Sequence, residues 1–120
     1  MDFSKMENLD IILLCGLYGS GKMEFAMKYF QGKGRSRISR SEIRKNVYEM
    51  TNFGEQWTPD RFSEENDALV KHIERKIVEH LTHQKKKILL INTFITKRSR
   101  QAILDLAHQT KKSIGAVFLN

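Results

Sequence analysis

The stretch "LDIILLCGLYGSGKM" at residues 9–23 joins an apolar run to a glycine-rich segment. Residues 10–15 form a short continuous apolar run rich in branched side chains, a pattern typical of a strand buried on both faces. From Gly16 the spacing is that of a phosphate-binding loop, G-x-x-x-x-G-K, but Met23 occupies the position of the hydroxyl residue that would coordinate magnesium. The stretch therefore predicts a buried strand, a phosphate-binding turn and a helix, with one metal ligand replaced.

The glycines and the lysine of this turn have distinct expected roles. Gly16, Gly19 and Gly21 allow positive φ angles, so that successive backbone N–H groups turn inward and form an anion nest at a helix N-terminus. Lys22 lies in the first helical turn, where a cation opposes the helix dipole unless a phosphate group offsets it. We therefore interpret the stretch as a phosphate cradle, with Lys22 as the charge that stabilises the phosphate. The cradle is expected to comprise Gly16, Gly19, Ser20, Gly21, Lys22 and Met23.

The rest of the chain alternates between strand and helix patterns. Helices are predicted within residues 19–30, after a cap at Ser39 or Ser41, from Arg61 to about Gln84, and around residues 103–107. In the second of these helices, Ile43, Val47 and Met50 are expected on the apolar side. Further strands are predicted at residues 36–39, 88–92 and 114–120, and residues 51–60 are expected to form a loop. This order predicts an α/β, three-layer P-loop NTPase fold, with a parallel sheet of about four strands and helices on both faces.

Composition limits the domain count and the type of partner. The 120 residues suit a single domain over residues 1–120, and 21 Lys and Arg against 14 Asp and Glu give a formal charge of +7. That balance favours polyanionic partners such as nucleotides or nucleic acid. The polar N-terminus and the short apolar run predict no signal peptide and no membrane span, and Cys15 has no second cysteine to pair with. We therefore expect a cytoplasmic, intracellular protein.

Three segments together resemble the P-loop kinases of the polynucleotide 5′-hydroxyl kinase type, which include zeta-toxin-like proteins. They are "GLYGSGK" at 16–22, "SRSEIRK" at 39–45 and "ILLINTFITKRSRQAILDLA" at 88–107. The resemblance implies that the strand of the third segment lies beside the P-loop strand. It implies transfer of the γ-phosphoryl group of ATP to a hydroxyl group, often the 5′-hydroxyl of DNA or RNA. It also implies that Arg40 and Arg44 lie near an acceptor phosphate.

The sequence departs from the family pattern where the chemistry takes place. Met23 replaces the hydroxyl of the loop, Ser41 replaces the acidic base, and Asn92 replaces the strand-end aspartate near magnesium. We therefore assign no metal ligand and regard magnesium as doubtful. Glu42 is a candidate base, but adjacent helical residues point about 100° apart, so it is no simple substitute for position 41.

Family members continue beyond the strand at which this chain ends, with a lid and usually a further strand. We therefore expect a domain that lacks the C-terminal lid region and has an apolar sheet edge beside residues 114–119. Pairing with a second copy of the chain would cover that edge and give a homo-oligomer.

Three functions remain open from the sequence. The first is a degenerate kinase domain that binds ATP or another nucleoside phosphate weakly and has little or no phosphotransferase activity. The second is an active ATP-dependent kinase that acts on a 5′-hydroxyl polynucleotide or a small hydroxylated substrate. The third is a basic module that binds nucleic acid through Arg35, Arg37, Arg40, Arg44 and the cluster at 97–100.

Overall fold

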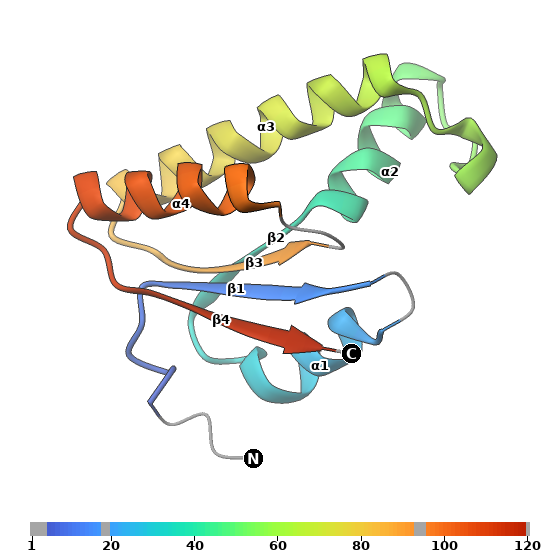
Figure 1. Ribbon diagram of the computed structural model, residues 1–120. Helices are drawn as coiled ribbons and strands as arrows, with labels where there is room; N and C mark the ends of the chain where they lie inside the picture. The colour runs from blue at the N-terminus through green and yellow to red at the C-terminus, as the bar shows by residue number, and fades with distance from the viewer. Residues whose placement is uncertain (1–4, 18–19, 93–95, 120) are drawn as a thin grey trace.

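The computed structural model describes residues 5–17, 20–92 and 96–119, which form four strands and four α-helices in alternating order (Figure 1). A single 3-10 turn, η1, precedes the longest helix. The elements are β1 (Ile11–Gly16), α1 (Lys22–Phe30), β2 (Arg35–Ser39), α2 (Arg40–Thr51), η1 (Pro59–Arg61), α3 (Glu64–His83), β3 (Lys87–Asn92), α4 (Lys97–Gln109) and β4 (Ile114–Leu119). All strand pairs are parallel, and the strand order is β2-β3-β1-β4.

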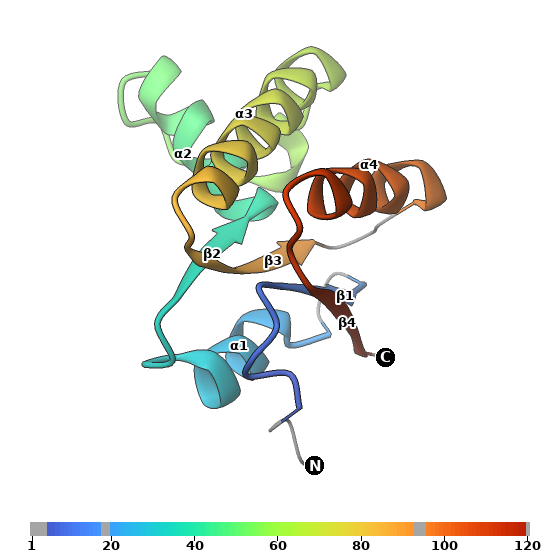
Figure 2. The same cartoon turned by 90° about the vertical axis from the view of Figure 1, so that its left-hand side faces the viewer.

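Helices cover both faces of this sheet. Helices α2, α3 and α4 lie on one face and α1 lies on the other (Figures 1 and 2). Successive side chains of a strand point to opposite faces. Accordingly, Ile11 and Leu13 join the core beneath α3 and α4, whereas Ile12 and Leu14 join the core on the α1 side. The α/β, three-layer parallel fold is therefore confirmed, including the position of β3 beside β1.

Hydroxyl side chains determine where three of the helices begin. Ser39 Oγ accepts a hydrogen bond from the Glu42 backbone N–H at the start of α2, and Thr96 Oγ1 accepts one from Ser99 at the start of α4. Ser63 caps α3 in the same way, by accepting from the Asn66 N–H. Because the 3-10 turn and this cap precede it, α3 begins at Glu64 and not at Arg61.

The expected apolar side of the second helix is only partly correct. Val47 is buried and Ile43 packs against the core, but Met50 is 74% exposed. The last turn of α2 extends beyond the edge of the sheet, so Met50 has no sheet surface to cover (Figure 1). Tyr48 is buried in its place, and its ring meets Trp57 edge-on at a centroid distance of 5.5 Å.

The two edges of the sheet differ in character. The outer strand β2 carries Arg35 and Arg37, and charged side chains of this kind discourage pairing with another chain. Strand β4 has the sequence IGAVFL, without a charge or a proline, and its Phe118 is 62% exposed. Within the described ranges, no helix is both long and apolar enough to cross a lipid bilayer.

Candidate phosphate-binding site

Strand β1 delivers the glycine-rich turn to the carboxyl edge of the sheet. Cys15 lies opposite Asn92 of β3, and Gly16 lies opposite Leu119 of β4. A Cβ atom on Gly16 would lie 2.5 Å from Ser20 Oγ and 3.1 Å from the Leu119 carbonyl oxygen. Gly16 is thus required for close packing, and the expectation that its φ is positive is wrong because it still belongs to the extended strand.

Gly21 is the residue of the turn that uses a left-handed conformation. It is the N-cap of α1 with φ 79° and ψ 28°, and this conformation favours glycine. Gly19, which the sequence also assigns to the cradle, lies outside the described residues.

The beginning of α1 has unsatisfied hydrogen-bonding groups. The first N–H groups of a helix have no partner within the helix, and here Gly21 has no side chain with which to cap them. Side chains cap the other three described α-helices. In addition, Ser20 Oγ is buried without a hydrogen-bond partner among the described residues. The turn therefore presents donors that an anion would satisfy.

Lys22 folds back over this turn. Its Nζ donates hydrogen bonds to the carbonyl oxygens of Gly16, at 2.9 Å, and Leu17, at 3.0 Å. Partial burial lowers the pKa of Lys22 below the ordinary 10.5, although the charge of Cys15 opposes this shift. Burial raises the pKa of the Cys15 thiol, against the opposing effects of Arg100 and Lys22. Partial burial thus disfavours the charged form of the Lys22 ammonium group, and a phosphate bound at the loop would favour that charged form.

Neither residue at the two positions where the resemblance leads us to expect metal ligands has a typical magnesium-binding side chain. The Met23 side chain packs against the core on the α1 side. Asn92, at the end of β3, is 5% exposed and supplies a neutral amide in place of a carboxylate. A thioether and an amide do not match the hard oxygen ligands that magnesium prefers. Among the described residues, no group of three His, Cys, Asp or Glu side chains is arranged to hold a metal ion.

The expected acceptor residues form ion pairs within the protein. Arg40 donates to both carboxylate oxygens of Glu74, at 3.0 and 2.8 Å. Arg44 donates twice to Asp67 Oδ1, at 2.9 and 2.7 Å. These pairs hold α2 against α3, and both arginines are well shielded from solvent.

The candidate base and its neighbour are also engaged. Glu42 forms an ion pair with Arg37, with a distance of 2.9 Å between Arg37 Nε and Glu42 Oε1. Ser41 Oγ lies 3.0 Å from Ser39 Oγ. The geometry thus shows which protein groups Glu42 and Ser41 contact, and their role toward a substrate stays a prediction.

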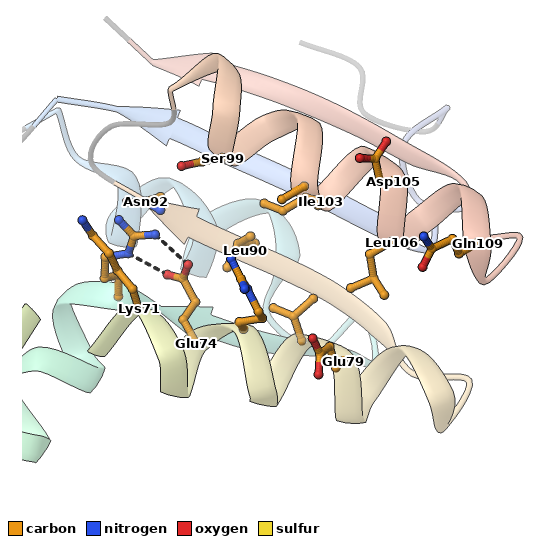
Figure 3. Close-up of a pocket in the computed structure, with 14 residues that line it drawn as sticks. Lys71, Glu74, Glu79, Leu90, Asn92, Ser99, Ile103, Asp105, Leu106 and Gln109 are labelled. Atoms are coloured by element: carbon orange, nitrogen blue, oxygen red, sulfur yellow. Dashed lines mark hydrogen bonds and ion pairs between the residues drawn. The ribbon is translucent and has the colours of Figure 1, made fainter. Parts of the chain in front are cut away.

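A groove that the sequence did not predict lies between α3 and α4, above the end of β3 (Figure 3). Its volume is about 390 Å³, and it is lined by Asn92, by Arg40 and by side chains of both helices. Lys71, Glu74 and Arg75 contribute from α3, and Ser99 contributes from α4. Arg40, Asn92 and Ser99 belong to the segments at 39–45 and 88–107, but no local motif marks the lining residues of α3, because the groove arises from how α3 and α4 pack together.

Comparison with solved structures shows which proteins share the fold. A candidate kinase from Chloroflexus aurantiacus matches with a TM-score of 0.74 over 95% of this chain and 60% of its own length, at 11% identity. A chain of the Pnkp1/Rnl/Hen1 complex matches with a TM-score of 0.68 over 93% of this chain and 36% of its own, at 18% identity. A chain from a structure of the Pnkp1/Rnl/Hen1 RNA repair complex matches with a TM-score of 0.65 over 99% of this chain and 36% of its own length, at 16% identity. This chain therefore spans less than two thirds of the length of each, 60% of the first and 36% of the other two.

Sequence comparison identifies the family. No curated protein gives a significant match to the chain. The family profile described as an AAA domain matches residues 11–120, which include the strand, the turn and every described helix. The chain belongs to the AAA domain family and has a P-loop kinase-like fold.

Proposed function

We propose that this chain binds the phosphate groups of ATP or another nucleoside phosphate at the turn between β1 and α1, with weak or no phosphotransferase activity. The observation that carries the proposal is that no side chain caps the first N–H groups of α1, while the Lys22 ammonium group folds back over the same turn. Backbone donors, a lysine and a buried Ser20 hydroxyl that has no partner in the described part of the chain converge there. None of these groups needs a metal ion to attract an anion.

Weak transfer activity follows from the residues at the positions of the reaction. Phosphoryl transfer depends on positioning and on charge stabilisation, to which magnesium contributes strongly when bound. Two unit charges about 4 Å apart interact by roughly 4 kcal/mol at an effective dielectric of about 20. Replacing an aspartate by Asn92 beside a divalent ion would therefore cost several kcal/mol, and each 1.4 kcal/mol is about tenfold in rate. Met23 and Ser41 remove further groups, so we infer turnover many orders of magnitude below that of a complete kinase.

The engaged side chains argue against the two other functions. An active kinase would need Glu42 or a water molecule in place of the lost groups, and Glu42 is paired with Arg37. A nucleic-acid module would use its arginines together with the cluster at 97–100, and of these Arg40 and Arg44 are paired with carboxylates of α3. The Arg35 guanidinium group donates to the backbone carbonyl oxygens of Met6, Glu7, Leu9 and Ile88.

Calorimetric titration with ATP, with magnesium and with a chelator, tests the proposal. We expect measurable binding in both conditions, and substantial loss in Lys22→Ala. Lys28→Ala is the matched control, because it removes the same charge from the same helix away from the turn. Absence of heat at millimolar ATP, or equal loss in the two variants, would refute phosphate binding at the turn.

A transfer assay separates this function from an active kinase. Labelled γ-phosphate is offered with a 5′-hydroxyl oligonucleotide and, separately, with small hydroxylated compounds. We expect no transfer above that of Lys22→Ala. Transfer that Lys22→Ala abolishes would replace the weak-activity proposal with the active kinase.

We also propose that β4, an edge strand of the described sheet, supports self-association. The support is its uncharged sequence and the exposed Phe118, because an unblocked edge strand is a template for pairing. Light scattering at tens of micromolar should give a mass above that of a monomer, and Val117→Pro, which removes a backbone donor from this strand, should reduce it. A monomeric mass would contradict the proposal.

A further inference from the structure

The groove between α3 and α4 combines an apolar base with polar ends. Val78, Leu90, Ile103 and Leu106 supply its apolar surface. A volume of about 390 Å³ lies within the range of small-molecule sites, roughly 300–1,000 Å³. From Lys71 to Glu79 the α3 wall covers nine residues, or about 12 Å along the helix axis from the first to the last. The groove therefore has the dimensions of a small elongated molecule.

Asn92 is the polar group of this groove that lies beside the strand carrying the phosphate-binding turn. The residue is 5% exposed and lines the groove, and its side chain makes no hydrogen bond with a described residue. Its amide is not sealed from solvent, since the buried side-chain polar atom without a partner among the described residues is Ser20 Oγ, so the amide is available to hydrogen-bond to a molecule in the groove. Asn92 also lies opposite Cys15, the residue that precedes the phosphate-binding turn. This end of the groove thus adjoins the proposed nucleotide site.

The charges lining the groove are unevenly distributed. Lys71 lies near the Asn92 end (Figure 3), and Arg75, four residues further along α3, also lines the groove and has no ion pair with any described residue. Lys71 forms an ion pair with Asp67 at 3.8 Å, and the Asp67 carboxylate also accepts hydrogen bonds from Arg44. Glu79 and Asp105 lie toward the opposite end (Figure 3). One end therefore favours an anionic group, whereas the acidic residues at the other would repel a long polyanion.

From this arrangement we propose that the groove binds a small amphipathic anion carrying a hydroxyl group. The anionic group interacts with Lys71 and Arg75, a polar group hydrogen-bonds to Asn92, and the apolar body covers Leu90 and Ile103. The further assignment of this molecule as the phosphoryl acceptor rests on the proposed function, and it names a small acceptor in preference to a polynucleotide.

Three probes that share one body and differ in charge test the proposal by ligand-observed NMR titration without nucleotide. They are para-hydroxyphenylacetate, the neutral para-hydroxyphenylacetamide and the cationic tyramine. We expect affinity to fall in that order. Equal affinities, or no binding of the anion at millimolar concentration, would overturn the proposal.

Paired variants locate the binding. Ala102→Trp fills the groove from an exposed position on α4, and His108→Trp places the same side chain on that helix outside the groove. Arg75→Gln removes a lining charge, and Lys76→Gln removes one that does not line the groove. We expect the first of each pair to weaken anion binding, by about fivefold for Arg75→Gln, and the second to leave it unchanged. Equal effects within both pairs would refute the groove as the site.

A 5′-hydroxyl thymidine hexanucleotide provides the competing macromolecular ligand. Tighter binding of the hexanucleotide than of the anion, lost in Ala102→Trp, would overturn the small-acceptor assignment. Failure of ATP binding with intact anion binding would refute the proposed function and leave the groove as a binding site. Failure of anion binding with intact ATP binding would refute the groove alone.

Discussion

The ion pair between Arg40 and Glu74 offers a quantitative test of why α2 stays on α3. The two side chains are 17% and 9% exposed, and they share two hydrogen bonds. Removing one partner of a largely buried pair leaves an uncompensated charge, which costs about 3–5 kcal/mol when burial is complete. Because this pair keeps some solvent contact, we expect Glu74→Met to destabilise the protein by about 2–3 kcal/mol.

The double variant should recover most of that loss. Arg40→Met with Glu74→Met replaces the pair by two apolar side chains of similar length, and such exchanges are often close to neutral. The predicted coupling energy is therefore about 2 kcal/mol. The exposed pair of Arg37 and Glu42, whose side chains are 49% and 40% exposed, is the control. Its coupling should stay below about 1 kcal/mol.

Equilibrium unfolding in urea measures these quantities. With a denaturant slope of about 2 kcal/mol per molar, Glu74→Met should lower the midpoint by about 1–1.5 M. The double variant should return the midpoint to near that of the wild type. A shift below about 0.5 M for Glu74→Met, on the same slope, or strictly additive effects of the two substitutions, would refute the view that this pair fixes α2.

Further predictions concern the turn and its lysine. Gly21→Ala should lower the free energy of unfolding in urea by about 1–2 kcal/mol, because Gly21 has a positive φ, and it should weaken ATP binding in a titration. Gly32→Ala is the control: Gly32 also has a φ of 79°, so the loss of stability should be equal, but ATP affinity should not change. Met23→Thr should place a hydroxyl at the expected metal position, so that magnesium tightens ATP binding more in the variant than in the wild type. The same ratio of the ATP dissociation constants with magnesium and with chelator in both proteins would contradict this. Burial lowers the pKa of Lys22 in the free protein, so ATP affinity should begin to fall on the alkaline side at a lower pH than for an ordinary lysine of pKa 10.5. Lys22→Arg should move that fall to higher pH in titrations across the same range, and identical pH profiles would argue against Lys22 as the phosphate contact.

Local pattern predicted the elements of the fold well because β1 and β3 have continuous apolar runs and the helices carry apolar residues at helical spacing. The run from Ile11 to Cys15 is buried as expected, and it positions the glycine-rich turn at the carboxyl edge. The ion pairs could not be predicted, since Arg40 and Glu74 are 34 residues apart and meet only when α2 packs on α3. Gly16 illustrates a subtler limit, because sequence alone does not distinguish a glycine needed for close packing from one needed for a positive φ.

Backbone amide NMR shifts on adding pyrophosphate report where the anion binds without requiring any reaction. If the turn between β1 and α1 binds phosphate, the largest shifts should fall on Ser20, Gly21, Lys22 and Met23, in the presence of a chelator as well as of magnesium. Largest shifts at the basic residues 97–100, or shifts that appear only with magnesium, would contradict phosphate binding at this turn.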